Sequence, residues 1–117
     1  MKVGIDIEEV ERFLSINLEK FCQKYFTEYE KNYALKKGVQ TVCGIYSCKE
    51  AILKAFGLGI GNGVSLKDIS ILHDEKGKPF IEENQTFKDL KTKYNITEYD
   101  ISISHTKTIA QSICVLK

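Results

Sequence analysis

Two carboxylates and a lysine have the types and spacing needed to act on a phosphate group. Asp6 follows Gly4 in the alternating segment 3–7, where a strand would point it away from the apolar side chains. Glu50 and Lys54 are one helical turn apart on the same face of a predicted helix. Two acids can bind a divalent cation, and an ammonium can neutralise a leaving phosphate. The structural alternatives are a solvent-facing or helix-capping Asp6 and a surface ion pair between Glu50 and Lys54.

Two further segments could approach a phosphate-bearing ligand. Glycines alternate from residue 57 to 63, but they follow a predicted helix and lack a Gly-Lys-Ser/Thr ending, which excludes the dinucleotide-fold and P-loop fingerprints. A helix end running into a turn is the structural alternative there. Ser104, His105 and Thr106 end a predicted strand, and their side chains can donate hydrogen bonds to phosphate oxygens. Adjacent strand residues point to opposite faces, so Ser104 and His105 are not expected to act as nucleophile and base.

The elements that must position these residues follow from periodicity and capping signals. Thr27 and Glu30 form a capping box that starts a helix over 28–37, and Gly38 ends it. A longer helix is predicted from 41 or 42 to 56. The other predicted elements are a strand at 3–7, a helical turn at 8–13, an apolar cluster at 21–26, a hairpin of strands 68–73 and 79–82, a helix at 84–93 and strands at 99–104 and 109–116. This order predicts an α+β fold in which the long helix packs on an antiparallel sheet.

Burial can also be predicted for several side chains. The long helix has an apolar stripe that includes Val42 and Leu53, with Lys49 expected partly off it. His73 is expected on the surface at a strand end. The four cysteines have no C-x-x-C spacing and are expected to be small core residues with free thiols, not zinc ligands: Cys22, Cys43, Cys48 and Cys114.

Length and charge limit the function classes. A chain of 117 residues is about one domain, expected over 1–117, and folding hides only about two thirds of its surface. A large pocket is therefore expected to borrow walls from a neighbouring subunit. The net charge of +1 excludes a global attraction to nucleic acid or a membrane, and no apolar run reaches the roughly 20 residues of a membrane span. The cytoplasm is the expected compartment.

Several short motifs occur in one order along nearly the whole chain. They are Gly4-Ile-Asp6-Ile, Phe26-Thr-Glu28, Lys49-Glu50-Ala51, Lys54-Ala55, Gly57-x-Gly59-Ile, Gly77-Lys-Pro79 and Ile103-Ser-His105-Thr106. Each motif is weak alone, but together they resemble the holo-[acyl-carrier-protein] synthases of the 4'-phosphopantetheinyl transferase family, and the resemblance implies that family's fold.

The resemblance implies an enzyme that transfers the 4'-phosphopantetheine group of coenzyme A to a serine of an acyl carrier protein, in support of fatty acid biosynthesis, and releases adenosine 3',5'-bisphosphate. Asp6 and Glu50 match the family's Mg²⁺-binding acids. Glu50 also matches a residue that helps to deprotonate the serine, and Lys54 one that assists the departing phosphate. The competing functions are a coenzyme A or carrier-protein binding module without turnover and a metal-dependent phosphodiesterase.

The resemblance also implies a homotrimer with sites between subunits. It places Lys49, the loop from Gly57 through Gly59 to Gly61, and Ser104, His105 and Thr106 around coenzyme A. It assigns the docking of an acidic carrier protein to a basic segment that contains Arg12, Lys20 and Lys24. One departure concerns Ile45, which stands where the family often has an arginine able to contact the cofactor or the neighbouring subunit.

Overall fold

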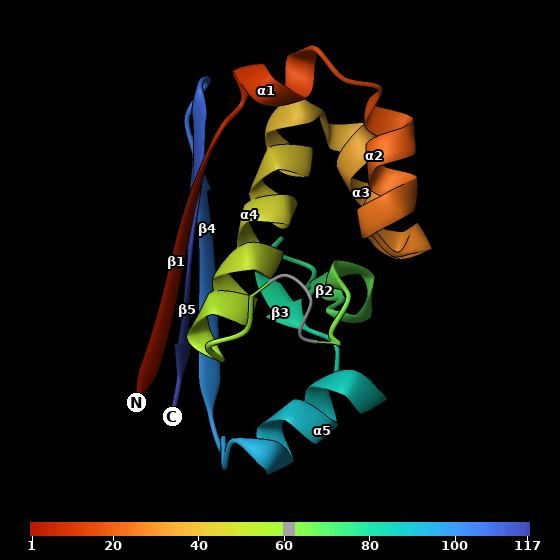
Figure 1. Ribbon diagram of the computed structural model, residues 1–117. Helices are drawn as coiled ribbons and strands as arrows, with labels where there is room; N and C mark the ends of the chain where they lie inside the picture. The colour runs from red at the N-terminus through yellow and green to blue at the C-terminus, as the bar shows by residue number, and fades with distance from the viewer. Residues whose placement is uncertain (60–62) are drawn as a thin grey trace.

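A three-stranded antiparallel sheet carries a long helix on one of its faces (Figure 1). The computed structural model describes residues 1–59 and 63–117. Its elements in chain order are β1 (Lys2–Glu9), α1 (Glu11–Leu14), α2 (Leu18–Tyr25), α3 (Glu28–Lys37), α4 (Val39–Ala55), the 3-10 helix η1 (Leu66–Asp68), β2 (Ile71–His73), β3 (Pro79–Ile81), α5 (Gln85–Lys93), β4 (Tyr99–His105) and β5 (Ile109–Leu116). The predicted α+β class and the packing of the long helix on an antiparallel sheet are confirmed.

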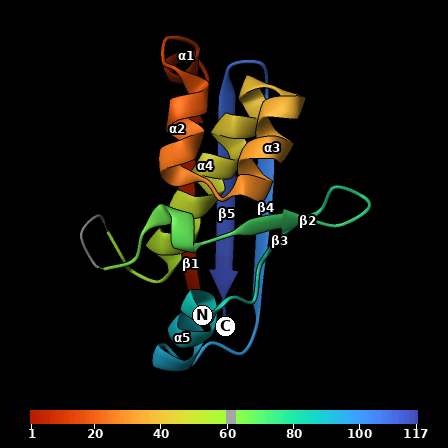
Figure 2. The same ribbon diagram turned by 90° about the vertical axis from the view of Figure 1, so that its right-hand side faces the viewer.

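Helix α4 lies between two layers. The sheet, in the order β1-β5-β4, covers one side of it, and α2, α3 and the β2–β3 hairpin lie on the other side (Figure 2). The hairpin is a separate two-stranded sheet. In the main sheet Asp6 pairs with Ser112, and Ser112 pairs with Ile103. Strands β1 and β4 are therefore edges on opposite sides of β5.

Most element boundaries agree with the capping and periodicity signals. The capping box of Thr27 and Glu30 is present, and α3 covers the predicted residues. Helix α4 begins earlier than predicted because Gly38 has a φ of 129°, which lets the chain turn directly from α3 into α4. The predicted strand over 68–73 is shorter, since a turn capped by Ser65 occupies residues 66–68.

The two faces of β1 are buried in the opposite sense to a simple amphipathic strand. Gly4, Asp6 and Glu8 face α4 and are buried, whereas the apolar side chains point outward. Val3 is 62%, Ile5 53% and Ile7 60% exposed. The alternation of the two faces was predictable, but the polar face is the covered one. The uncovered face of the sheet is therefore apolar.

Gly4 is the point at which α4 lies closest to the sheet. A Cβ atom at this position would lie 2.0 Å from the Ala51 carbonyl oxygen and 2.4 Å from the Ala55 backbone nitrogen. The glycine therefore lets the helix backbone rest directly on β1. This contact fixes the height of the second half of α4 above the acidic residues of the strand.

The core fills the space on both sides of α4. All four cysteines are buried and carry free thiols, as expected. No helix in the described part of the chain is long and apolar enough to cross a membrane.

We expect Gly4→Ala to destabilise the fold by about 3 kcal/mol or more, because the new methyl group meets helix backbone that no side-chain rotation can move. Chemical denaturation measures the loss. Gly44→Ala is the matched control, since its Cβ would meet only the Ile103 Cγ2 methyl group at 3.0 Å, and a change within about 1 kcal/mol is expected. Equal stability of both variants would contradict the close approach at Gly4.

Candidate active site

Asp6 is buried, and only one of its two carboxylate oxygens accepts a hydrogen bond from a described residue. Its side chain is 7% exposed, and Oδ1 accepts a hydrogen bond from Lys54 Nζ at 3.0 Å. The Ser47 hydroxyl donates to the Asp6 carbonyl oxygen at 3.1 Å, which ties β1 to α4 beside the carboxylate. Oδ2 is buried and has no hydrogen-bond donor among the described residues. A buried carboxylate oxygen without a donor is costly, so it indicates that a ligand completes this site.

Glu50 reaches the same place from α4. Burial, followed by the negative charge of Asp6, raises the pKa of Glu50, while a hydrogen bond from Tyr46 and the charge of Lys54 lower it. Asp6, Glu50 and Lys54 thus form one cluster, which combines β1 with two successive turns of α4. The structure brings these three residues together, and their individual roles stay predictions.

Glu8 is a third acid at this cluster that the sequence analysis missed. It lies two residues after Asp6 on the same covered face of β1. Burial and the neighbouring Asp6 raise the pKa of Glu8 to about 7, and Arg12 opposes this shift. The sequence carried a signal for it, because residues two apart on a strand share a face.

The donor set of the cluster suits a hard divalent cation. Its groups are carboxylate oxygens, one of them buried without a donor, and Mg²⁺ prefers such oxygens together with water and phosphate oxygens. Among residues 1–59 and 63–117 no three His, Cys, Asp or Glu side chains are already arranged as a complete metal site. Asp6 and Glu50 would therefore supply part of a coordination shell that a phosphate-bearing substrate completes.

Lys49 does not lie where we expected it. Its side chain is fully buried, and Nζ lies 2.6 Å from Glu30 Oε1. The same ammonium donates to the carbonyl oxygens of Tyr25 at 2.9 Å and Leu66 at 2.8 Å. All three N–H groups are engaged within the protein, so the expected contact of Lys49 with coenzyme A does not agree with this structure.

Glu30 completes this buried network and was also missed as a key residue. Its Oε1 accepts from the Thr27 backbone N–H at 2.8 Å, and Oε2 accepts from the Ile71 N–H at 2.7 Å. Burial raises the pKa of Glu30 and lowers that of Lys49, and each charge opposes the shift of the other. The pair therefore joins α3 and β2 to the helix that carries Glu50.

Two adjoining hollows flank Tyr25 and Tyr46 next to the acids. One, of about 400 Å³, contains Glu50, Lys24 and the apolar side chains that follow α4. The other contains Arg12. Arg12 and Lys24 thus lie on either side of the two tyrosines. Lys20 is exposed on α2 and lines neither hollow.

The glycine-rich loop is only partly described. Gly57 directly follows α4 with a φ of 75°, and its N–H donates to the Lys54 carbonyl oxygen at 2.9 Å. Gly59 lines the hollow beside Glu50. Gly61, the last of the three predicted glycines, lies outside the described residues.

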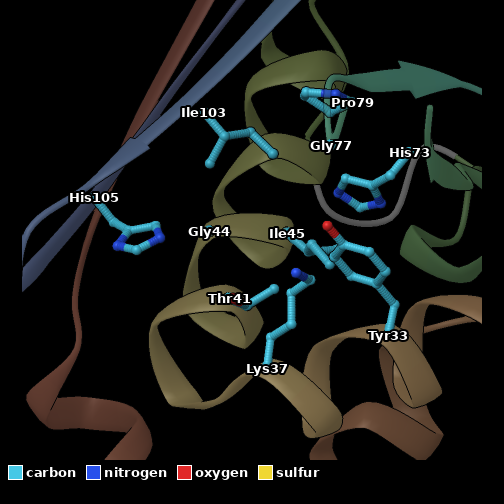
Figure 3. Close-up of a pocket in the computed structure, with 10 residues that line it drawn as sticks. All are labelled: Tyr33, Lys37, Thr41, Gly44, Ile45, His73, Gly77, Pro79, Ile103 and His105. Atoms are coloured by element: carbon cyan, nitrogen blue, oxygen red, sulfur yellow. The ribbon is translucent and has the colours of Figure 1, made fainter. Parts of the chain in front are cut away.

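Apart from the two hollows at the acids, a separate pocket of about 220 Å³ lies between α4, the hairpin and β4, and we call it the second pocket. Figure 3 shows His105 pointing toward it from β4, with Lys37 reaching in from α3 on the other side. His73 lies at the end of β2, as predicted, but it is half-buried because its ring stacks on the Tyr33 ring with centroids 3.8 Å apart. Burial and the charge of Lys37 lower the pKa of His73. Ile45 forms part of the wall.

The three residues predicted to bind coenzyme A at the end of β4 have different surroundings in the structure. His105 lines the second pocket, but Ser104 alternates to the uncovered face of the sheet. The Thr106 hydroxyl accepts hydrogen bonds from the N–H groups of Thr108 at 3.2 Å and Ile109 at 3.1 Å, which shape the turn into β5.

The acidic cluster and the second pocket lie on opposite flanks of α4. Thr41 lines the pocket and Glu50 belongs to the cluster, and their spacing at about 100° per residue puts them on opposite sides of the helix. Asp6 lies on the β1 edge of the sheet and His105 on the β4 edge. The two places therefore open on different sides of α4.

Known proteins resemble this chain over almost all of its length. A sequence model of the 4'-phosphopantetheinyl transferase superfamily matches residues 2–110. The holo-[acyl-carrier-protein] synthase of Thermoanaerobacter sp. strain X514 is 42% identical over 118 residues, covering 97% of this chain and 84% of the relative. That of Alkaliphilus metalliredigens is 40% identical and covers 95% of each chain.

Solved structures agree with these relatives. The Helicobacter pylori holo-[acyl-carrier-protein] synthase in complex with coenzyme A has a TM-score of 0.83 and 28% identity, covering 98% of this chain and 99% of the other. The Bacillus anthracis holo-(acyl-carrier-protein) synthase, solved with CoA (3',5'-ADP), has a TM-score of 0.80 and 36% identity, covering 98% and 94%. The expected fold is thereby confirmed.

We expect Lys49→Met to lower the free energy of unfolding by about 3–5 kcal/mol, because it leaves Glu30 buried without its cation. The double variant Lys49→Met/Glu30→Gln removes both charges and should recover a large part of the loss. Denaturant titration of both variants measures this difference. Lys91→Met, which breaks a more exposed pair with Glu83, is the control and should change stability by less than about 1 kcal/mol. A Lys49→Met protein as stable as this control would contradict the conclusion that the Lys49–Glu30 pair holds α3 and β2 against α4.

Proposed function

The chain belongs to the 4'-phosphopantetheinyl transferase superfamily, and from this premise we propose that it transfers the 4'-phosphopantetheine group of coenzyme A to a serine of an apo acyl carrier protein. The products are the holo carrier protein and adenosine 3',5'-bisphosphate. The observation that carries the proposal is the buried Asp6 Oδ2, which has no hydrogen-bond donor within residues 1–59 and 63–117 and lies at a cluster with Glu50 and Lys54.

The proposed cation is Mg²⁺, held by Asp6 and Glu50. These carboxylates come from two different elements and lie near each other in partly buried surroundings. Their mutual repulsion there would be relieved by a bound divalent cation. A bound Mg²⁺ would neutralise charge on the pyrophosphate as its bond to the leaving nucleotide breaks. The support is the donor chemistry of the cluster, since all its candidate ligands are hard oxygens.

Lys54 and Glu50 would handle the charge and the proton of the transfer. Lys54 Nζ is held by Asp6 Oδ1 and by the Ile5 carbonyl oxygen at 3.3 Å, yet its side chain is 53% exposed. It can therefore donate its remaining N–H to an oxygen of the leaving phosphate. Glu50 would accept the proton of the serine hydroxyl as the new P–O bond forms and the P–O bond to adenosine 3',5'-bisphosphate breaks.

We place the nucleotide end of coenzyme A in the second pocket of a neighbouring subunit (Figure 3). Lys37 and His105 supply positive or donating groups for phosphate there, and the stacked Tyr33 and His73 rings supply a flat wall. In this chain Lys37 would compensate for Ile45, which brings no charge. The homotrimer of the family would join one copy's acids to the next copy's pocket.

The uncovered sheet face supports this assembly. It exposes Val3, Ile5 and Ile7 on β1 together with Ile109 and Ile113 on β5, which a neighbouring copy would bury. Both sheet edges, β1 and β4, are also available for contacts between copies.

The carrier protein would dock on the basic segment beside the acids. Arg12 and Lys24 border the hollows next to Glu50, and Lys20 extends the positive charge along α2. A role in fatty acid biosynthesis and a cytoplasmic location belong to the same proposal. The free thiols of the four cysteines suit a reducing compartment.

We expect Asp6→Asn and Glu50→Gln each to lower the transfer rate about a hundredfold or more, because each removes one charge from the cation site. The assay incubates the protein with coenzyme A and an apo acyl carrier protein, and follows the mass gain of the carrier together with the released nucleotide. Omission of Mg²⁺, or its removal with a chelator, should have the same effect as the substitutions.

The control is an acid outside the cluster. Glu83→Gln removes the charge of a carboxylate that is paired with Lys91, and it should leave the rate unchanged. Nucleotide release without carrier modification would favour a phosphodiesterase, and coenzyme A binding without turnover would favour a binding module. Transfer that needs no divalent cation would refute the metal role.

A further inference from the structure

An aromatic stack forms one wall of the second pocket. Tyr33 comes from α3 and His73 from the end of β2, and their rings lie with centroids 3.8 Å apart and an angle of 8° between their planes. Figure 3 shows the two rings on the side of the pocket away from His105. Both residues are half-buried, so the stack belongs to the pocket surface and not to the core. A flat ring surface of this kind suits a planar ligand group.

Tyr29 fixes the stack in place before any ligand arrives. Its hydroxyl accepts a hydrogen bond from the His73 backbone N–H at 3.1 Å and lies 3.5 Å from His73 Nδ1. The Tyr29 and Tyr33 rings are one turn apart on α3, with centroids 5.9 Å apart. A wall that is already ordered loses little entropy when a ligand binds. Tyr29 is therefore a positioning residue for the two rings.

The polar side chains of the second pocket suit phosphate. Lys37 Nζ lies 5.2 Å from the centre of the Tyr33 ring and forms no ion pair with an acid in the described part of the chain. The described residues that line this pocket include no Asp or Glu. The positive charge of Lys37 is thus available to an anion, and the His105 ring adds a hydrogen-bond donor.

The size of the second pocket limits what it can hold. Its volume is about 220 Å³, below the roughly 300–1,000 Å³ of pockets that enclose a drug-sized ligand. It therefore holds one part of a larger molecule. A flat ring wall beside an available cation matches a planar base with phosphate groups next to it.

We propose that Tyr33 and His73 are specificity-determining residues that select a purine base in the second pocket. The base stacks on the paired rings, while Lys37 and His105 bind the phosphates. A purine has two fused rings and covers more of an aromatic surface than a pyrimidine does, so the stack favours it. This recognition rests on the proposed function only for the presence of a nucleotide in the pocket.

Two nucleotides that differ only in the base test this selection without any transfer reaction. Adenosine 3',5'-bisphosphate and uridine 3',5'-bisphosphate carry the same phosphates on the same sugar, and calorimetry measures the dissociation constant of each for the full chain. The titrations are made above pH 7, because burial and the charge of Lys37 lower the pKa of His73 and its ring is then neutral. The wild type should bind the adenosine compound about fivefold more tightly than the uridine compound.

Loss of either ring should remove most of this preference. Tyr33→Leu and His73→Leu each break the stack, so each should weaken binding of the adenosine compound about tenfold and reduce the preference to about twofold or less. Tyr33→Phe keeps the ring and should keep both the affinity and the preference. Lys37→Ala removes a phosphate contact, so it should weaken both nucleotides equally and leave their ratio unchanged. Tyr94→Leu is the matched control, since Tyr94 also packs on another aromatic ring but lies at the end of α5, and it should change neither constant.

The ratio of the two dissociation constants separates base recognition from a purely structural role of the stack. If the rings only held the hairpin against α3, their loss would weaken both nucleotides equally. An unchanged ratio in Tyr33→Leu and His73→Leu would therefore overturn the proposal, and so would a wild type that binds both nucleotides equally or binds neither. The rings come from different elements, so one leucine variant is sufficient if circular dichroism shows that the other does not fold.

These outcomes are separate from the fate of the proposed function. A chain that transfers the arm normally but shows no base preference loses only the base recognition. A chain that shows the ring-dependent preference but transfers nothing keeps the base recognition and loses the proposed reaction.

Discussion

The buried ion pair between Lys49 and Glu30 is the interaction on which the arrangement of the site depends. With no exposed surface, it ties α4 to α3, to the end of α2 through Tyr25, and to the segment after the glycine-rich loop through Leu66. A buried pair adds little net stability, but loss of one partner is costly, so the pair selects one arrangement of these segments. Glu50 is the next residue along the helix and therefore turns toward β1. Glu50 is thus held at the acidic cluster by the lysine before it.

The acidic cluster was partly predictable because its members follow strand and helix periodicity. The spacing of Glu50 and Lys54 and the alternation around Asp6 were enough to place them on defined faces. Which face of β1 is covered was not predictable from alternation alone, although Gly4 was a signal that backbone approaches there. Lys49 was misjudged because a lysine is usually exposed, yet its spacing of seven from Val42 puts it within the buried stripe of α4.

The second pocket could not be built from the sequence. It joins α3, α4, the hairpin and β4, which are brought together only by the tertiary packing of α4 between its two layers. The stacked pair of Tyr33 and His73 spans such a long-range contact, and no local pattern marks it. The cluster and the pocket lie on opposite flanks of α4. This separation is the reason that we propose a site shared between two copies of the chain.

The central claim is that Asp6 of one copy and the His105 pocket of another act on the same coenzyme A. Mixed assembly tests it most directly. Asp6→Asn protomers are co-refolded in equal amounts with Lys37→Ala/His105→Ala protomers, each inactive alone, and transfer is assayed. Random mixing in a closed ring leaves about a quarter of the sites with an intact acid and an intact neighbouring pocket, so about a quarter of wild-type activity is predicted. Activity no greater than that of the separate variants would contradict the shared site.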